Sequence, residues 1–537
     1  MFRRDFLRAS AAGTVLGGVS PEMWAQSTRR AGAHGGAWNN GQLLHLLPTV
    51  SDSELLIKAS FAATLNAPPI LRVGSRNVAG RMTDTRGQMW QFHATGLEPA
   101  RRYPLALLSG GKSGGKALCE PWHITTFPAP DSKPEKVRIL LFTCAGGHEA
   151  HHYLPTVLRN RLLRRGLSFQ PDAAIANGDH VYWDLRSPLT AKSQGQSPAG
   201  LAIAGTPTRS SPIFGSDNEQ FIKTAAGPQI VPVYGTDFRS TPVFFIQDDH
   251  DYYDNDDAYD EIVTFPPDHF MREMARATQS MYYPEFLPDA ARPTGLPGAS
   301  AFGRALPVAE SFGTLRYGRL LEMLLYTVRS TMTMAGPSAV FLEDTVEGWL
   351  KARMAATGVA HVVNLPSNPP GWTAGKWGEW YPDMLSPDGK LTDATPKPYW
   401  QSGWLKQHDR LMTAMSAMRG RVPLVMSGDL HASAVGRMLR TGNADLSANP
   451  VVAVLTGPVG TRPTGWPSGI RKIAAQPPRH IQMEEWIKPT EEHGFTLADF
   501  TADKVTLRMF KWNNRTQPPE ALDTLEPFHT VELPRPA

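Results

Sequence analysis

The sequence predicts an α/β protein with parallel strands, preceded by a small all-β domain. The α/β prediction rests on short apolar runs, typical of buried strands, that repeatedly end in residues of metal-binding types. In the clearest run, residues 173–182 (AAIANGDHVY), an apolar strand stops at Asn177 and Gly178 and presents Asp179 and Tyr182. Three further runs have the same form: residues 137–144 (VRILLFTC), 241–251 (TPVFFIQDDHD) and 422–431 (VPLVMSGDLH). Open α/β sheets place their functional residues at the carboxyl ends of such strands.

These four strand ends predict one shared metal site. They carry cysteine, aspartate, tyrosine and histidine, all of which are metal ligands or general acids. A single aspartate after a strand is usually a turn or helix-cap residue, so each run alone would favour a structural explanation. Because the ends of neighbouring parallel strands lie at one edge of a sheet, four such ends together favour a common site.

Residues 43–128 predict the all-β domain. Apolar and polar residues alternate along residues 55–61 and 122–126, as in half-buried strands. Residues 96–107 (GLEPARRYPLAL) are typical of the corner in immunoglobulin and fibronectin-III modules, where Tyr103 would hydrogen-bond back across the turn. We interpret this domain as a packing or lid-supporting unit, with sugar or surface binding as the alternative. Pro128, Pro130 and Pro134 indicate the linker to a second domain at residues 136–530.

The second domain begins as a βαβ unit. A helix with an apolar stripe is expected over residues 153–165, between the strands at 137–144 and 173–177. Residues 186–235 are rich in Ser, Pro and Gly and predict a long irregular loop. Further expected elements are a strand at 320–328, a helix at 342–355, an aromatic loop at 372–381, a helix at 404–418, strands at 422–427 and 450–456, and a hairpin at 495–512.

Composition and the N-terminus bear on location and partners. A net charge of +4 over 537 residues argues against a stable nucleic-acid complex. Residues 1–26 resemble a twin-arginine signal peptide, with Arg3 and Arg4 before a modest apolar run and cleavage near Ala25. We therefore expect a periplasmic or secreted protein that uses the twin-arginine export machinery and has no transmembrane span when mature. An uncleaved N-terminal anchor is the alternative.

The two cysteines allow one disulfide bond at most. A bond between Cys119 and Cys144 is possible in an exported protein. We prefer Cys144 as a metal thiolate, because it lies at a strand end where a ligand is expected, and Cys119 as a strand residue of the first domain.

With these motifs identified, the chain resembles the PhoD-like alkaline phosphatase and phosphodiesterase family of the calcineurin-like metallophosphoesterases over nearly its whole length. The family's motifs correspond to residues 143–145, 178–183 and 247–251, and its G-D-x-H-x-S motif to residues 428–433. The Asp179 to Tyr182 and Asp429 to His431 spacings also resemble purple acid phosphatases. The resemblance implies a four-layer α/β/β/α sandwich and a phosphoric ester hydrolase.

The resemblance also implies a two-metal centre. One ion would be iron(III), held by Cys144, Asp179, Tyr182 and His431. A second divalent ion (calcium, zinc or manganese) would be held by Asp179 as a bridge, Asp249 and Asp429. Thiolate and phenolate suit the more highly charged ion, and carboxylates suit a hard divalent one. Such a pair would bind the phosphate and activate a water molecule.

Catalytic roles are expected for Asp179, as the bridging carboxylate, and for His250. His250 is the candidate to protonate the leaving group or to hold the phosphoryl oxygens, with a core histidine as the alternative.

Several positions depart from the family pattern around these ligands. The residues are Ala145 for Gln, Trp183 for Glu, Gln247 for Trp, Asp251 for Glu, and Tyr326 for Asp. Residues that surround ligands orient them and shape the pocket, so these changes bear on metal identity and substrate. His148, His151 and His152 could add a ligand, but we favour a helix start. Arg329 and the tryptophan-rich loop could hold a phosphate or leaving group.

The sequence therefore predicts an exported, metal-dependent hydrolase of small-molecule or polymeric phosphate esters, favouring diesters or mixed esters. Two other hypotheses remain open. One is a cell-envelope protein that binds glycans or surfaces and has a structural metal site. The other is an ester hydrolase in which Cys144 is a nucleophile.

Overall fold

The computed structural model describes residues 38–39, 41–111, 115–151, 153–183, 205–253, 266–289, 311–461 and 467–536. Contacts divide the chain into Met1–Gly36 and one compact unit, Ala37–Ala537. The predicted export signal lies outside the described residues. Within the described part of the chain, no helix has the length and apolar character needed to cross a membrane.

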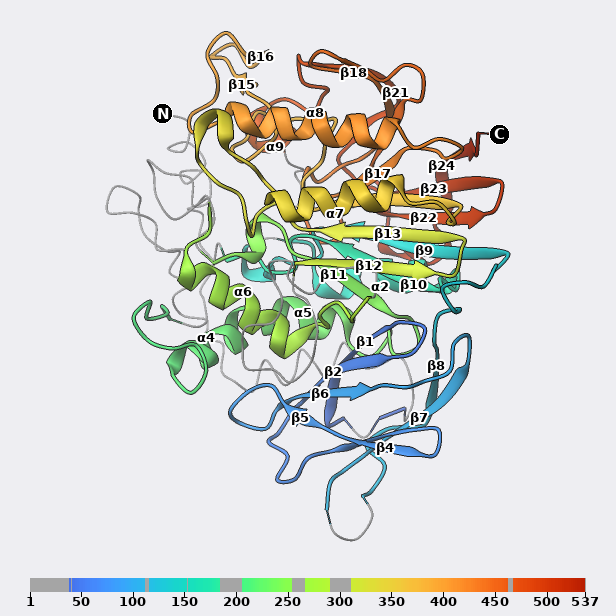
Figure 1. The fold of residues 1–537 in the computed structure, drawn as a ribbon. Helices are drawn as coiled ribbons and strands as arrows, with labels where there is room; N and C mark the ends of the chain where they lie inside the picture. The colour runs from blue at the N-terminus through green and yellow to red at the C-terminus, as the bar shows by residue number, and fades with distance from the viewer. Residues whose placement is uncertain are drawn as a thin grey trace. The chain divides into compact units, whose positions relative to one another are not determined.

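The N-terminal part of the compact unit is an all-β sandwich, as expected (Figure 1). One sheet has the order β1 (Leu43–Val50), β2 (Leu55–Phe61), β6 (Met89–Ala94), β5 (Arg81–Met82). The other has the order β4 (Arg76–Ala79), β3 (Ile70–Val73), β7 (Arg102–Leu108), β8 (Trp122–Thr125). The Glu98 amide donates to the Tyr103 hydroxyl across the corner at 2.8 Å, which confirms the predicted tyrosine contact.

A six-stranded sheet carries the first three predicted site strands. Its order is β11 (Val243–Ile246), β10 (Ala173–Asn177), β9 (Lys136–Thr143), β22 (His493–Thr501), β23 (Lys504–Trp512), β24 (Pro527–Pro534). Strands β9, β10 and β11 are parallel, and their register pairs Thr143 with Asn177 and Asn177 with Ile246. The residues that follow these three strands therefore lie at one edge of the sheet.

An eight-stranded sheet carries the fourth site strand. Its order is β12 (Phe312–Tyr317), β13 (Leu321–Tyr326), β14 (His361–Pro366), β17 (Leu424–Ser427), β20 (Val451–Thr456), β18 (Ser433–Thr441), β19 (Ala444–Asp445), and β21 (Ile481–Thr490) pairs with β18. Strands β13, β14, β17 and β20 are parallel.

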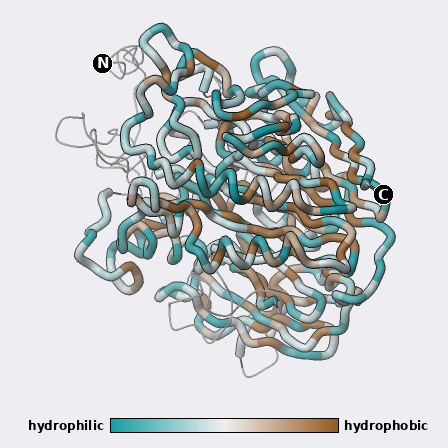
Figure 2. Tube along the Cα trace, turned by 45° about the horizontal axis from the view of Figure 1, so that its top comes forward, coloured by the Kyte–Doolittle hydropathy of each residue, from teal (hydrophilic) through white to brown (hydrophobic). Residues whose placement is uncertain are grey.

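Alternation along the strands produces four layers. Ile139 and Leu141 of β9 belong to the apolar core that Met323 of β13 also joins, which lies between the two sheets. Leu140 and Phe142 pack with α2 (Thr156–Ser168), α4 (Asp217–Ala225), α5 (Gly227–Tyr234) and α6 (His269–Tyr282). The outer face of the second sheet packs with α7 (Asp344–Ala355) and α8 (Ser402–Ser416). This arrangement confirms the predicted α/β/β/α fold, and Figure 2 shows hydrophobic residues concentrated along its central strands.

The structure corrects the expected loop at residues 186–235. Helices α4 and α5 occupy residues 217–234, because Ile230, Val231 and Val233 bury an apolar face that outweighs the helix-breaking tendency of Pro232. The expected helix at 153–165 begins later, at Thr156, and the helices at 342–355 and 404–418 lie within two residues of α7 and α8. Strands β12, β14, β18, β21 and β24 were not expected from the sequence.

Candidate metal centre

The predicted site residues all follow the carboxyl ends of parallel strands. Cys144 follows β9, Asp179 follows β10, Asp249 begins the 3₁₀ turn after β11, and Asp429 follows β17. His431 lies two residues beyond Asp429. Two sheets thus supply one site.

The structure brings together the four predicted ligands of the first ion. The Cys144 sulfur, a carboxylate oxygen of Asp179 and a ring nitrogen of His431 all lie within 4.8 Å of one another. The Tyr182 hydroxyl donates to Asp179 Oδ2 at 2.8 Å and lies 2.9 Å from His431 Nε2. Among the described residues, the buried Asp179 Oδ1 has no hydrogen-bond partner. Thiol, phenol, carboxylate and imidazole in this arrangement fit a metal ion.

Backbone strain is concentrated at the same residues. Eight described non-glycine residues have positive φ, and four of them are predicted ligands: Cys144 (51°), Asp179 (58°), Asp429 (68°) and His431 (50°). Such a conformation costs about 1–3 kcal/mol per residue and persists where the surroundings enforce it. Its repetition at four ligand positions supports a functional site.

Burial disfavours the ionised forms of two of these groups, the Cys144 thiol and the Tyr182 hydroxyl, unless a cation is nearby. Desolvation, with the nearby Asp179 charge, raises the pKa of the Cys144 thiol and of the Tyr182 hydroxyl well above their usual ranges. A metal ion reverses this preference, because it stabilises thiolate and phenolate directly. The donor set therefore fits an ion of high charge.

The predicted ligands of the second ion, Asp179, Asp249 and Asp429, fall into two clusters rather than one. Asp249 groups with Asp179 and His250, and separately with Asp248 and Asp429. The Lys376 ammonium, however, lies between two of these carboxylates, 3.0 Å from Asp249 Oδ2 and hydrogen-bonded to Asp429 Oδ1. The amide of Asn368 donates to the other oxygen of Asp429 at 2.9 Å. The predicted second set therefore differs from the first, because a protein cation already pairs with two of its carboxylates, although Asp249 Oδ1 has no hydrogen-bond partner among the described residues.

Arg329 adds a second buried cation. Its Nε donates to Asp248 Oδ1 at 2.9 Å, and its Nη2 lies 4.0 Å from Asp429 Oδ2. Both the Arg329 and the Asp248 side chains are fully buried. Arg329 was considered for substrate binding, but in the structure it compensates carboxylate charge.

His250 is half-buried rather than a core residue. Its ring lies 4.3 Å from the Tyr182 ring, centroid to centroid, and one of its nitrogens lies within 4.8 Å of carboxylate oxygens of Asp179 and Asp249. This position, at the site and partly open, suits proton transfer to a substrate.

Asp251 holds the ligand-bearing loops together. Its Oδ2 accepts from the amides of Asp179 (3.0 Å) and Asp248 (2.8 Å), and its Oδ1 accepts from those of His180 (2.8 Å) and Val181 (3.2 Å). Asp251, which stands where the family has the longer glutamate, therefore joins the loops after β10 and β11.

Two further supports were not expected from the sequence. Gln229 of α5 accepts from the amides of Gly147 (2.7 Å) and Tyr182 (2.8 Å) and donates to the Tyr182 carbonyl (2.9 Å). Arg159 of α2 donates to the carbonyls of Ala145 and Gly146 at 2.9 and 3.0 Å. Helices on the outer face thus fix the loop that carries Cys144.

The other residues that differ from the family pattern pack against neighbouring side chains. Gln247 donates to the Tyr283 hydroxyl at 2.8 Å, and Trp183 stacks on Phe221 at 5.9 Å between ring centroids. Tyr326 lies in the apolar core beneath α7 and α8, so the position where the family has aspartate supplies no carboxylate.

Both cysteines are free, so the possible disulfide is not formed. Burial raises the pKa of Cys119 to about 11, as expected for a packing residue. The residues near His148 form a short 3₁₀ turn, Glu149–His151, ahead of α2, in which His148 Nδ1 accepts from the Ala150 amide. His152 lies outside the described residues.

Two residues of the site, Asn368 and Lys376, were not predicted from the sequence. Asn368 follows β14, an apolar run that could have been identified as a fifth strand end. Lys376 lies in the expected aromatic loop, and nothing in its local sequence points to the site.

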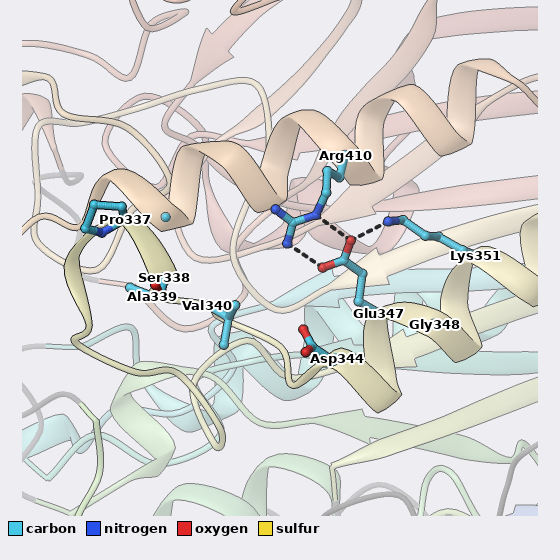
Figure 3. A pocket seen from close by; sticks show the side chains of 10 residues that line it. Pro337, Ser338, Ala339, Val340, Asp344, Glu347, Gly348, Lys351 and Arg410 are labelled. Atoms are coloured by element: carbon cyan, nitrogen blue, oxygen red, sulfur yellow. Dashed lines mark hydrogen bonds and ion pairs between the residues drawn. The ribbon is translucent and has the colours of Figure 1, made fainter.

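A separate pocket of about 460 Å³ lies between α7 and α8 (Figure 3). Glu347 lines this pocket, accepts from Arg410 at 2.7 and 2.6 Å and pairs with Lys351. None of the predicted site residues lines this pocket, and we interpret its ion pairs as structural.

Comparison with known proteins supports the fold. No family model and no curated protein matches the sequence. The solved structure of PhoD matches with a TM-score of 0.58 and 13% identity, covering 93% of this chain and 90% of that one. The chain has a PhoD-like fold. A purple acid phosphatase, PPD1 from yellow lupin (Lupinus luteus) seeds, matches with a TM-score of 0.53 and 12% identity, covering 92% of this chain and 74% of that one.

Proposed function

We propose that this protein is an exported, metal-dependent hydrolase of phosphate esters. The observation that carries the proposal is the convergence of Cys144, Asp179, Tyr182 and His431 at strained strand ends. The PhoD-like fold supports it, because both similar structures are proteins named as PhoD or as a phosphatase.

The chain's own residues have distinct roles in this proposal. Cys144, Asp179, Tyr182 and His431 would hold the ion, which we propose is iron(III). When bound, the ion supplies positive charge that polarises a phosphate oxygen and a water molecule. His250 holds the proton that the leaving oxygen takes up. Asp251 and Gln229 keep the ligand loops in place.

We propose substrates that are phosphate diesters or monoesters, outside the cytoplasm. Export rests on Arg3, Arg4 and the apolar run that follows them. Glycan or surface binding by residues 43–128 stays a prediction from the sequence.

A substrate screen tests the proposal. Purified full-length protein, loaded with metal, is assayed against p-nitrophenyl phosphate, bis(p-nitrophenyl) phosphate and alkyl p-nitrophenyl diesters over a broad pH range. We expect turnover that Asp179→Asn abolishes together with metal binding. Asp84→Asn, which changes a buried aspartate of the β-sandwich, is the control and should retain both. Absence of turnover with all of these esters would overturn the proposal.

A further inference from the structure

We propose that the Lys376 ammonium is a built-in cation that takes the place of a second metal ion, so that the centre holds one metal ion beside a fixed ammonium. This inference deepens the proposed function and rests on its metal site, but it concerns metal content rather than turnover. The observation behind it is the position of Lys376 Nζ between Asp249 Oδ2, at 3.0 Å, and Asp429 Oδ1. These are two of the three carboxylates expected to hold the second ion.

The ammonium pairs with one oxygen of each of two carboxylates that a divalent ion would need, whereas Asp249 Oδ1 and Asp248 Oδ2 stay buried without a hydrogen-bond partner among the described residues. Asp429 uses one oxygen for Lys376 and the other for the Asn368 amide. Asp249 uses Oδ2 for Lys376. Both carboxylates are almost completely buried, at 1% side-chain exposure, so they require a positive partner. A neutral amine would leave this charge uncompensated.

Arg329 adds a second protein cation beside these carboxylates. It is fully buried, donates to Asp248, and lies at ion-pair distance from Asp429. Asp248, Asp249 and Asp429 therefore face two protein cations. A divalent ion that entered between Asp249 and Asp429 would have to displace Lys376 and leave a buried ammonium without its partners, which is unfavourable.

The backbone of Lys376 is held in place on both sides. Its amide donates to Glu379 Oε2 at 3.2 Å, and its carbonyl accepts from Lys397 Nζ at 2.7 Å. The neighbouring Gly375 carbonyl accepts from Arg471 at 2.7 Å. Only 6% of the Lys376 side chain is exposed. The lysine is thus part of a built loop rather than a mobile surface residue.

The first site keeps its donors. Asp179 Oδ1 has no hydrogen-bond partner among the described residues, and it lies in the cluster with Cys144, Tyr182 and His431. The ion would then be held by Cys144, Asp179, Tyr182 and His431, and the ammonium by Asp249 and Asp429.

Metal counting tests this inference without an activity assay. Full-length protein is equilibrated by dialysis with Mn²⁺ or Zn²⁺, and all metals are counted by mass spectrometry. We expect about one ion per chain in the wild type and about two in Lys376→Met, because the freed Asp249 and Asp429 then require a cation. Lys376→Arg, which keeps the charge, should retain one.

Lys223→Met is the matched control. Lys223 also lies buried between two carboxylates, 2.6 Å from Asp84 and 3.1 Å from Glu219, but outside the metal centre. Its replacement should leave the metal count unchanged. Circular dichroism establishes that each variant is folded.

Two results would overturn the inference: two tightly held ions in the wild type, or an unchanged count in folded Lys376→Met. If Lys376→Met does not fold, anomalous scattering from wild-type crystals soaked in Mn²⁺ decides. One peak beside Cys144 and Tyr182 supports the inference, and a second beside Asp179, Asp249 and His250 contradicts it. These outcomes are independent of whether any ester is cleaved, so failure of the proposed function remains distinguishable.

Discussion

Replacing Cys144 distinguishes its predicted role as a metal ligand from its alternative role as a nucleophile. Cys144→Ser retains a small polar side chain at the strained position but cannot supply a thiolate. We expect metal affinity to fall by more than the roughly 10- to 100-fold that loss of an outer partner costs. We also expect weaker visible absorption from a thiolate bound to the proposed iron(III) ion. Metal titration and absorption spectra measure both effects. Cys119→Ser should change neither, and a Cys144→Ser variant with intact metal binding but no turnover would favour the nucleophile hypothesis.

Asp251 is the positioning residue whose loss should loosen the site without removing a ligand. Its carboxylate accepts four backbone amides, and the amide group of Asp251→Asn can accept through one oxygen only. We expect a loss of about 1–3 kcal/mol in the free energy of unfolding and a roughly 10- to 100-fold weaker metal affinity. Denaturant melts and metal titration measure these quantities. If Asp251→Asn lost stability but bound metal as tightly as the wild type, Asp251 would be structural only.

The candidate ligands could be proposed from the sequence because Cys144, Asp179 and Asp429 follow apolar runs closely. That local pattern predicted a shared metal site near Cys144, Asp179 and His431 without knowledge of the strand order, and the family resemblance implied which residues would hold each ion. Lys376 could not be found in this way, because its place beside Asp249 depends on how a long loop packs against residues more than a hundred positions away. Asn368 was missed only because its strand was missed.

At the scale of secondary-structure elements, Glu347 is the group that ties α7 to α8. Burial raises the pKa of Glu347, but hydrogen bonds from Arg410, Lys351 and Gln407 outweigh this effect and lower the pKa to about 2. Because the folded-state pKa lies below the unfolded value, this stabilisation is present above about pH 4.3. It is lost as the pH falls toward 2.

We therefore expect Glu347→Gln to lower the free energy of unfolding at neutral pH by about 1.5–3 kcal/mol, with the difference from wild type shrinking below pH 4. Urea denaturation at several pH values measures this dependence. Glu484→Gln removes the exposed pair with Arg437 and should cost less than about 1 kcal/mol. An effect of Glu347→Gln that is independent of pH would contradict the assignment.

Elements were harder to predict where tertiary packing overrides local preference. The segment that forms α5 contains Pro228 and Pro232, which locally favour a loop, yet its apolar face packs beneath α2 and α6. Strand β14 (HVVNLP) is short and buried at all six positions, so it lacks the alternation that identifies a half-exposed strand. The long, regular helices α7 and α8 were predicted within two residues because their length makes the pattern clear.

At the scale of the whole compact unit, the β-sandwich and the α/β part share a core. One continuous apolar cluster includes Leu71 and Phe127 together with Phe244 of β11. Phe127 and Phe244 stack with 6.0 Å between their ring centroids. A buried ion pair, 3.0 Å between Lys58 of β2 and Glu285, joins the same two parts.

This shared core predicts that residues 43–128 and the rest of the compact unit unfold together. Lys58 Nζ also donates to Ser280 at 2.7 Å, and both partners of its ion pair are fully buried. Lys58→Met leaves the Glu285 carboxylate without this cation, so we expect a loss of about 3–5 kcal/mol. In differential scanning calorimetry the single transition should move to lower temperature without splitting. Two separate transitions in the wild type, or a shift confined to one of two transitions in the variant, would show that the two parts are independently stable and that the core does not couple them.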